Sequence, residues 1–381
     1  MKVVDMKCHV VEIPFSKAIR VSHSEEPARC YHIYLIELLT DEGITGIGDA
    51  SFYTGVSHWE KYLETYVKPF LLQEIVDPCS IEKFVSHFRV KPPGAGISPR
   101  PSCVEMALWD IIGKKAGLPI YKLLGGNKTR FKAYASVLQV QTYTVKEWVE
   151  LAREITRKGF RAVKMHLGGM GEGVQHVLDV VKAVRDDLGP EIDLMVDAQQ
   201  TWNPHPIEFR SALKLARGLE EYDVMWLEEP LPHLNNPDLS ARLCDAVDIE
   251  IAGGGSMFGW PAYKNLLEKG ALDIVQPDVT FVGGISEIRK IAFLAEAYGR
   301  RCVPHFSFGS DLGFAATLHA CSAIESPYVE YLYHPPYITE EVRNALSANP
   351  IKLSKDGYVE VPEGPGLGVA LKESWKSYLV K

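Results

Sequence analysis

The chain has 381 residues, more than one compact core holds and enough for a (β/α) barrel of about 250 residues with a smaller second domain. Apolar residues make up 46% and charged residues 24%, close to the average for globular proteins, so we expect the whole chain to fold. The formal charge of -8, with Lys and Arg scattered, argues against nucleic acid as a partner.

The amino-terminal stretch Met1–Pro14 alternates charged and apolar residues. It has no continuous apolar run long enough for a signal peptide or a membrane span, so we expect a cytoplasmic chain without a membrane partner. The cysteines are odd in number and about twenty residues or more apart, which predicts no zinc or redox pair of cysteines. Small buried side chains are the expected role for all of them: Cys8, Cys30, Cys79, Cys103, Cys244, Cys302 and Cys321.

Residues 1–126 predict an α+β domain in which strands come first and helices follow. The apolar run Tyr31–Leu39, the turn at 40–43 and the returning run Ile44–Gly48 favour a hairpin. In Ser102–Ala116 apolar residues recur at three- and four-residue spacing, which is typical of a helix.

Residues 127–350 have a different rhythm, in which short apolar runs alternate with helical stretches such as Val145–Lys158 and Ile285–Tyr298. A TIM-like (β/α) barrel needs eight such runs, so we predict an α/β fold of this type. An open doubly wound sheet is the alternative, but it lacks the glycine-rich nucleotide fingerprint after its first strand. Residues 351–381 fit none of the units and should pack back on the first domain. The runs are Tyr134–Val137, Ala162–Leu167, Ile192–Val196, Val224–Leu227, Ile249–Ala252, Asp273–Val275, Arg301–Pro304 and Tyr328–Leu332.

Ionisable residues fall at the ends of most of these runs. The carboxyl ends of barrel strands carry the active site, so these side chains should meet at one mouth. Taken singly, each could instead cap the following helix or remain a solvated side chain. The set comprises Lys164, His166, Asp197, Glu228, Glu229, Asp278, His305 and Glu330.

The spacing of these residues indicates their chemistry. Lys164 and His166 are two apart, so on a strand both side chains point to the same face. Asp197 and Glu228 end adjacent strands, and two such carboxylates suit a hard divalent cation such as Mg²⁺. A further carboxylate and imidazole, Asp278 and His305, are also one βα unit apart. A carboxylate bonded to one ring nitrogen raises the basicity of the other, which predicts a general acid/base pair.

Ordered motifs run through nearly the whole chain: Asp41–Gly48, Ser102–Gly126, Val163–His166, Val196–Ala198, Trp226–Pro230 and Gln276–Asp278 followed by Gly283–Ile285. In order and spacing they resemble motifs of the mandelate racemase and muconate lactonizing enzyme families of the enolase superfamily, in the mandelate-racemase-like subgroup. The resemblance implies an α+β capping domain, completed by the C-terminal tail, whose loops close over a Mg²⁺ site. It also implies abstraction of the proton α to a carboxylate, with the metal stabilising the enediolate.

The resemblance also implies a role for each matching residue. Asp197 and Glu228 resemble metal ligands, and Asp278 with His305 resembles the base or acid on one face of the substrate. Glu330 resembles the carboxyl group that hydrogen-bonds the substrate carboxylate. Lys164 resembles the first lysine of a Lys-x-Lys pair that contacts that carboxylate.

Two positions depart from the family pattern. The second lysine of the pair, the base on the other face, is His166 here, whose unperturbed pKa is near 6.5. The third metal ligand, normally a Glu after the fifth strand, aligns with Gly255, which offers no side-chain oxygen. We therefore expect Mg²⁺ to bind more weakly, through Asp197, Glu228, waters and the substrate; loss of the metal is the alternative.

These features favour a lyase that dehydrates a sugar acid or related hydroxy acid. His305 or His166 would take the α-proton, and one of them would protonate the leaving β-hydroxyl. Alternatives are a racemase or epimerase of a hydroxy acid or amino-acid derivative, and a catalytically silent relative that binds an acidic metabolite.

The substrate is a small carboxylate, selected by loops of the capping domain that we place at Arg20–Arg29 and Pro92–Gly96. Arg20 and His23 are candidates for contacting its distal end. Relatives of this kind are commonly dimers or octamers, so the resemblance implies a homo-oligomer.

Overall fold

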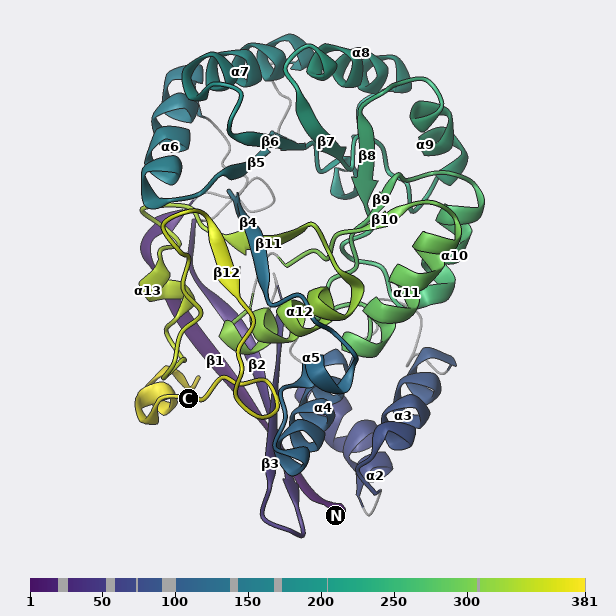
Figure 1. Cartoon of the computed structure of the whole chain (residues 1–381), viewed down its shortest axis with the longest axis vertical. Helices are drawn as coiled ribbons and strands as arrows, with labels where there is room; N and C mark the ends of the chain where they lie inside the picture. The colour runs from purple at the N-terminus through teal and green to yellow at the C-terminus, as the bar shows by residue number, and fades with distance from the viewer. Residues whose placement is uncertain are drawn as a thin grey trace.

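The structure is a computed structural model that describes residues 1–19, 27–52, 59–72, 75–90, 101–137, 143–167, 173–203, 205–306 and 309–380. A ring of strands enclosed by helices lies beside a smaller part with three long strands and its own helices (Figure 1). The predicted fold class, an α+β capping domain with a modified (β/α) barrel, is confirmed.

The capping domain begins with an antiparallel sheet in the order β1-β2-β3. Its strands are β1 (Val3–Ile19), β2 (Ala28–Thr40) and β3 (Thr45–Phe52). Strands β2 and β3 form the predicted hairpin. Helix α4 (Ser102–Ala116) has the predicted bounds and packs against β3. The contact needs glycine, because a β-carbon at Gly46 or Gly48 would clash with the backbone of α4. The other helical segments are α1 (Trp59–Tyr62), η1 (Leu63–Val67), α2 (Lys68–Leu71), α3 (Pro78–Val90) and α5 (Ile120–Leu123).

The barrel strands follow the predicted runs one for one. Neighbouring strands pair in parallel, in the order β10-β9-β8-β7-β6-β5-β4-β11. The limits of each predicted run differ from those of its strand by at most two residues, except for the first run, whose strand begins earlier. They are β4 (Arg130–Ser136), β5 (Ala162–His166), β6 (Asp193–Asp197), β7 (Val224–Glu228), β8 (Glu250–Gly253), β9 (Ile274–Val275), β10 (Arg301–Cys302) and β11 (Tyr328–Leu332).

Most of the barrel helices form the outer arc in Figure 1. Helix α6 (Val145–Lys158) shows why they form: Thr144 and Glu147 make a capping box at its start. Its buried residues, Trp148, Leu151, Ala152 and Ile155, recur at helical spacing and face the sheet. The others are α7 (Gly173–Leu188), η2 (Gln200–Trp202), α8 (Phe209–Glu220), α9 (Pro237–Cys244), α10 (Trp260–Glu268), α11 (Ile285–Ala297), α12 (Asp311–Ile324) and α13 (Glu340–Arg343).

The C-terminal tail contacts both parts of the molecule. Strand β12 (Tyr358–Glu360) pairs antiparallel with β4 of the barrel. Beyond it, the backbone N–H of Leu367 donates to Asp110 of α4, 2.9 Å away, and η3 (Glu373–Tyr378) packs on β1. The tail was expected only on the capping domain, but it also extends the barrel sheet.

The barrel interior has two layers of side chains, one above the other. The lower layer, which we call the apolar floor, is a separate cluster of buried residues: Tyr134, Ala162, Met195, Trp226, Ala252, Ile274 and Val303. Two residues further along the strands, and therefore on the same face, come the side chains that we call the ionic layer. The ionic layer contains Ser136, Lys164, Asp197, Glu228, Gln276 and His305, together with Glu330, which follows Tyr328 beside the floor.

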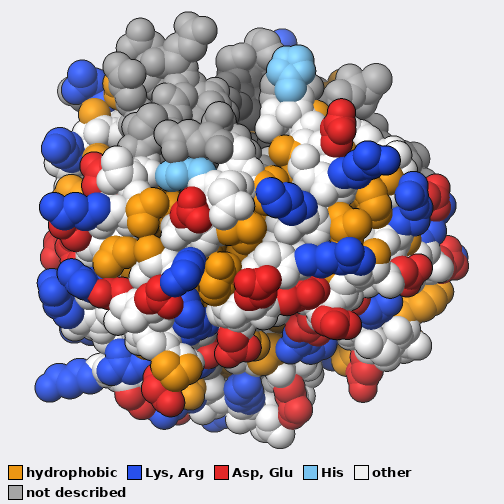
Figure 2. All heavy atoms as spheres, turned by 90° about the horizontal axis from the view of Figure 1, so that it is seen from above, with side chains coloured by type: hydrophobic (Ala, Val, Ile, Leu, Met, Phe, Trp, Pro, Cys, Tyr) orange, Lys and Arg blue, Asp and Glu red, His pale blue; other side chains and the backbone are white. Residues whose placement is uncertain are grey.

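The outer surface is mixed in charge. On the face in Figure 2, Lys and Arg side chains alternate with Asp and Glu, without a large area of one sign. Within the described residues no helix is both long and apolar enough to cross a membrane.

The prediction that all the cysteines are buried was wrong in part. Cys103 and Cys321 are buried, whereas Cys79 is exposed and Cys8, Cys30, Cys244 and Cys302 are partly exposed.

Candidate active site

Lys164 lies among three carboxylates of the ionic layer, and its side chain is fully buried. Its Nζ lies 2.8 and 2.9 Å from the two carboxylate oxygens of Glu228. It lies 2.9 Å from Glu330 Oε1 and 3.9 Å from Asp197 Oδ2. Burial lowers the pKa of Lys164, but the three negative charges outweigh burial and raise that pKa. The ammonium therefore stays charged and neutralises part of the site.

Asp197 and Glu228 are side by side, because β6 and β7 pair these two residues in register. Asp197 accepts a hydrogen bond from the backbone N–H of Gln199 at 2.8 Å, and Glu228 accepts one from Gln276 Nε2 at 2.8 Å. Burial raises the pKa of Asp197, but the charges of His166 and Lys164 outweigh burial and lower it. The pKa of Glu228 is raised, because burial and the charges of neighbouring carboxylates outweigh the effect of Lys164.

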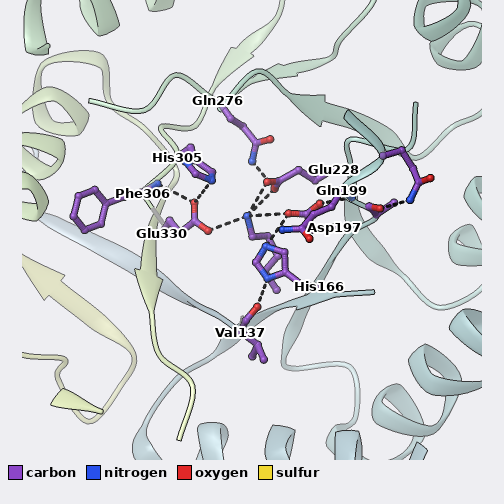
Figure 3. Close-up of polar contacts among 12 residues, drawn as sticks. Val137, His166, Asp197, Gln199, Glu228, Gln276, His305, Phe306 and Glu330 are labelled. Carbon is purple, nitrogen blue, oxygen red and sulfur yellow. Dashed lines mark hydrogen bonds and ion pairs between the residues drawn. The ribbon is translucent and has the colours of Figure 1, made fainter. Parts of the chain in front are cut away.

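His166 is held at both ring nitrogens (Figure 3). Its Nδ1 contacts the carbonyl oxygen of Val137, and its Nε2 lies 2.8 Å from Asp197 Oδ2. Since β5 and β6 pair His166 with Asp197, this contact follows from strand register. The imidazole predicted as a base is therefore tied to a predicted metal ligand.

The predicted acid/base pair is assembled by extensions of β9 and β10, where Asp278 and His305 form a parallel bridge. His305 Nδ1 lies 2.7 Å from Asp278 Oδ2, and the other oxygen of Asp278 accepts from Thr280 N at 2.7 Å and Oγ1 at 2.6 Å. Burial lowers the pKa of His305, but the charge of Glu330 and the hydrogen bond with Asp278 outweigh burial and raise it to about 9. A pKa above neutrality favours the protonated form of His305 at pH 7.

Glu330 connects the two sides of the ionic layer. One oxygen contacts Lys164, and the other accepts a hydrogen bond from the backbone N–H of Phe306 at 2.9 Å. His305 Nε2 lies 3.9 Å from that second oxygen. Burial raises the pKa of Glu330, but Lys164 and His305 outweigh burial and lower it. A buried carboxylate is thereby kept ionised between two cationic groups.

Gln276 of the ionic layer and Glu229 beside it are two further neighbours of Glu228. Gln276 is fully buried and orients Glu228, a role that was not predicted from the sequence although Gln276 follows Ile274 by two residues. Glu229 has a backbone φ of 46°, and its side chain interacts with Thr201. Burial and the charges of Asp197 and Glu228 raise the pKa of Glu229 to about 8.

Gly255, at the position of the missing metal ligand, lies against the acid/base histidine. Strand β8 ends at Gly253, and Gly254 has a φ of 101°, which favours glycine. A β-carbon on Gly255 would lie 3.1 Å from ring atoms of His305, tighter than ordinary van der Waals contact. A Glu side chain could enter here only if the His305 ring moved.

The donor set fits a hard cation in part. Two buried carboxylates, Asp197 and Glu228, stand together, and Mg²⁺ commonly takes one or two carboxylates and completes its shell with water and substrate oxygens. Over the described ranges, no group of three donor atoms within 4.8 Å of one another includes these two residues. A cation here would therefore depend on oxygens from water or substrate.

The structure brings most of the predicted site residues together and leaves two unplaced. Figure 3 shows His166, Asp197, Glu228, His305 and Glu330 facing a common centre. Arg20 and His23 lie outside the described residues, as does the Pro92–Gly96 segment.

Comparison with known families gives matches over most of the chain. Residues 8–125 match the model of the mandelate racemase/muconate lactonizing enzyme N-terminal domain. Residues 147–375 match the model described as enolase C-terminal domain-like.

Individual relatives are 27% to 31% identical to this chain over the aligned residues. It is 31% identical to arabinonate dehydratase of Saccharolobus solfataricus, over 90% of this chain and 88% of the relative. It is also 31% identical to D-galactarolactone cycloisomerase of Agrobacterium fabrum, over 97% of each chain. A racemase from Streptomyces coelicolor A3(2), solved with bound magnesium, superposes with a TM-score of 0.84 at 27% identity, over 99% of this chain and 100% of that one.

Proposed function

The chain belongs to the mandelate racemase/muconate lactonizing enzyme family of the enolase superfamily, and we propose that it is a hydro-lyase that removes water from a sugar acid. The observation that carries the proposal is the 2.7 Å contact between His305 Nδ1 and Asp278, which leaves Nε2 toward the ionic layer. An imidazole oriented in this way can accept or donate a proton at Nε2.

Lys164 and Glu330 are suited to hold the substrate carboxylate. The Lys164 ammonium provides positive charge in a buried site, where charge–charge interactions are stronger than in water. Glu330 is held ionised by Lys164 and His305, so it would donate a hydrogen bond to a carboxylate oxygen only after taking up a proton when the substrate carboxylate binds beside it. Asp197 and Glu228 would hold Mg²⁺, which when bound supplies further positive charge for the enediolate.

The reaction requires one proton to leave carbon and one to reach oxygen. His305, in its neutral form, takes the α-proton, and the electrons of that C–H bond form the enediolate. The β C–O bond then breaks, and a histidine protonates the departing hydroxyl so that it leaves as water. The enol that remains tautomerises to a 2-keto acid. His166 is the second candidate for either proton transfer.

The test is a screen of acid sugars with saturating Mg²⁺. Formation of a 2-keto acid, detected by its carbonyl chemistry, is the expected result. A specific substrate would show turnover with the wild type and none after His305 is replaced. Absence of 2-keto acid from every sugar acid tried would contradict the dehydratase proposal.

An isomerase is the second candidate, because His166 and His305 lie on different strands and both contact carboxylates of the ionic layer. A racemase or epimerase needs a base on each face of the substrate. In deuterium oxide this activity would exchange the α-proton without net loss of water. The same screen, followed by NMR, therefore separates the two functions.

The Mg²⁺ site is tested by titration of the purified protein. We expect weak binding of Mg²⁺ alone and tighter binding when a substrate-like hydroxy acid is present, because the acid supplies oxygens that position 255 does not. No heat of binding even with the acid present would argue that the metal has been lost.

A further inference from the structure

A second cluster of side chains that could bind a metal lies on the sheet of the capping domain. It consists of Glu12, Cys30 and His32, and the ligand atoms of all three lie within 4.8 Å of one another. We propose that this cluster binds a thiophilic divalent cation of the Zn²⁺ class.

The pairing of β1 with β2 builds the cluster. Glu12 and His32 are direct partners in the antiparallel register, and Cys30 precedes His32 by two residues. The three side chains therefore project from one face of the sheet. Tyr31 and Ile33, between and beside the ligands on β2, are buried on the opposite face. Strand pairing thus holds the donors on a rigid support.

The distances suit a tetrahedral ion. With metal–ligand distances of about 2.0 to 2.3 Å, donor atoms around Zn²⁺ lie about 3.3 to 3.6 Å apart. Glu12 Oε2 and His32 Nε2 are already 3.3 Å apart. Since all three donors lie within 4.8 Å, small side-chain rotations close the remaining gap.

The donor types select the ion. A thiolate, an imidazole and a carboxylate form a mixed set that favours Zn²⁺ over Mg²⁺, which prefers oxygen ligands alone. The two negative charges of Cys30 and Glu12 match the charge of a divalent cation. Glu12 and His32 side chains are 51% and 34% exposed, so an ion can enter from solvent and a water can fill the fourth position.

Two of the donors already interact, because the Cys30 thiol donates a hydrogen bond to Glu12. Binding of a cation would replace this hydrogen bond and the thiol proton by metal ligation. The cation would cross-link β1 and β2, because Glu12 comes from one strand and Cys30 and His32 from the other.

The test uses Co²⁺ as a spectroscopic probe on the purified full-length protein. We expect a near-ultraviolet sulfur-to-cobalt charge-transfer band with one equivalent of Co²⁺, displaced by Zn²⁺. Cys30→Ser should abolish the band. Cys79→Ser, which removes an exposed cysteine elsewhere, should retain it, as should Asp197→Asn, which alters the barrel site.

Two outcomes would overturn the proposal: absence of a thiolate band in the wild type, or an unchanged band in Cys30→Ser. Circular dichroism checks that each variant is folded. If Cys30→Ser fails to fold, His32→Gln tests the same site, with at least a tenfold loss of Zn²⁺ affinity expected. Neither readout depends on turnover, so the result is independent of the proposed dehydratase activity.

Discussion

The apolar floor and the ionic layer of the barrel are built by the same strands, yet one buries apolar side chains and the other buries charged ones. Met195 and Asp197, two residues apart on β6, show the contrast: one is buried among apolar side chains, and the other is buried among charges. Burial of the floor stabilises the fold, whereas the ionic layer has to offset the desolvation of its charges through pairing. The residues that stabilise the fold and the residues that carry the chemistry therefore lie in adjacent layers of the barrel interior. This separation of roles is what the following predictions test.

The sharpest test of this separation is His305→Asn, for which we expect turnover to fall about 10³-fold or more, because the residue that moves the proton is lost. The free energy of unfolding should also fall at neutral pH, because the charged imidazole is stabilised by Glu330 and Asp278 in the folded state, so circular dichroism is needed to show that the variant is folded. His9→Asn is the matched control, since His9 Nε2 also lies 2.8 Å from a carboxylate, that of Glu37, but on the capping sheet. If His305→Asn retained its turnover, the His305–Asp278 pair could not be the group that transfers the proton.

Lys164→Met is a change in the ionic layer that should also lower stability, because it leaves Glu228 and Glu330 buried without their cation. We expect a loss of about 3 to 5 kcal/mol in the free energy of unfolding at pH 8. Lys164 lowers the pKa of Glu330 in the folded protein. The stabilisation that this ion pair gives the wild type is therefore present above the ordinary carboxylate pKa and is lost on acidification. The variant should therefore approach the wild type at low pH. Urea unfolding at several pH values measures this; an equal loss at every pH would count against charge as the cause.

Two substitutions on β6 compare the layers directly. Met195→Ala should cost about 2 to 5 kcal/mol of unfolding free energy, because it leaves a cavity in the floor. Asp197→Asn should instead weaken Mg²⁺ binding by about 100-fold or more with a smaller change in stability, since a charged ligand is lost. Urea unfolding and metal titration of both variants give the comparison. The separation would be refuted if each variant changed both properties equally.

The pH profile sharpens the account of the ionic layer. With the pKa of His305 raised to about 9, a neutral base is scarce at pH 7 and increases as pH rises. We expect kcat/KM to rise about tenfold per pH unit and to level off near pH 9. In Asp278→Asn the midpoint should move to lower pH, because a carboxylate that raises the pKa has gone. A profile that falls over this range would identify His305 as the acid instead.

The smallest expected effect is that of Gly255→Ala. Its β-carbon would press on the His305 ring, so we expect a loss of kcat/KM of about tenfold or less and no gain in Mg²⁺ affinity. Steady-state kinetics and metal titration check both. Full activity would mean that the ring has room to move.

Much of the architecture could be predicted, because period and spacing are local signals. The limits of α4 and α6 agree with the predicted helices, and the eight apolar runs became the barrel strands. The ionic layer could also be anticipated, since a strand places every second residue on one face.

What the sequence could not reveal depends on contacts between distant segments. The approach of Gly255 to His305 needs the backbone turn at Gly254, and the role of Gln276 needs Glu228, which lies two strands away in the sheet. Cysteine spacing predicted no pair of metal-binding cysteines, yet Cys30 meets Glu12 and His32 through strand register. Side-chain partners of this kind become visible only once the sheet order is known.

The pairing of β12 with β4 has a consequence for biosynthesis. Residues 358–360 are made long after β4 and complete its edge, and the backbone N–H of Val380 then donates to Val10 of the first strand at 2.9 Å. The start of β4 and the free side of β1 therefore lack these partners while the intervening residues are synthesised. Until then the nascent barrel and its neighbouring sheet each keep an unfilled edge, which makes this stage the one at which a chaperone has most to protect.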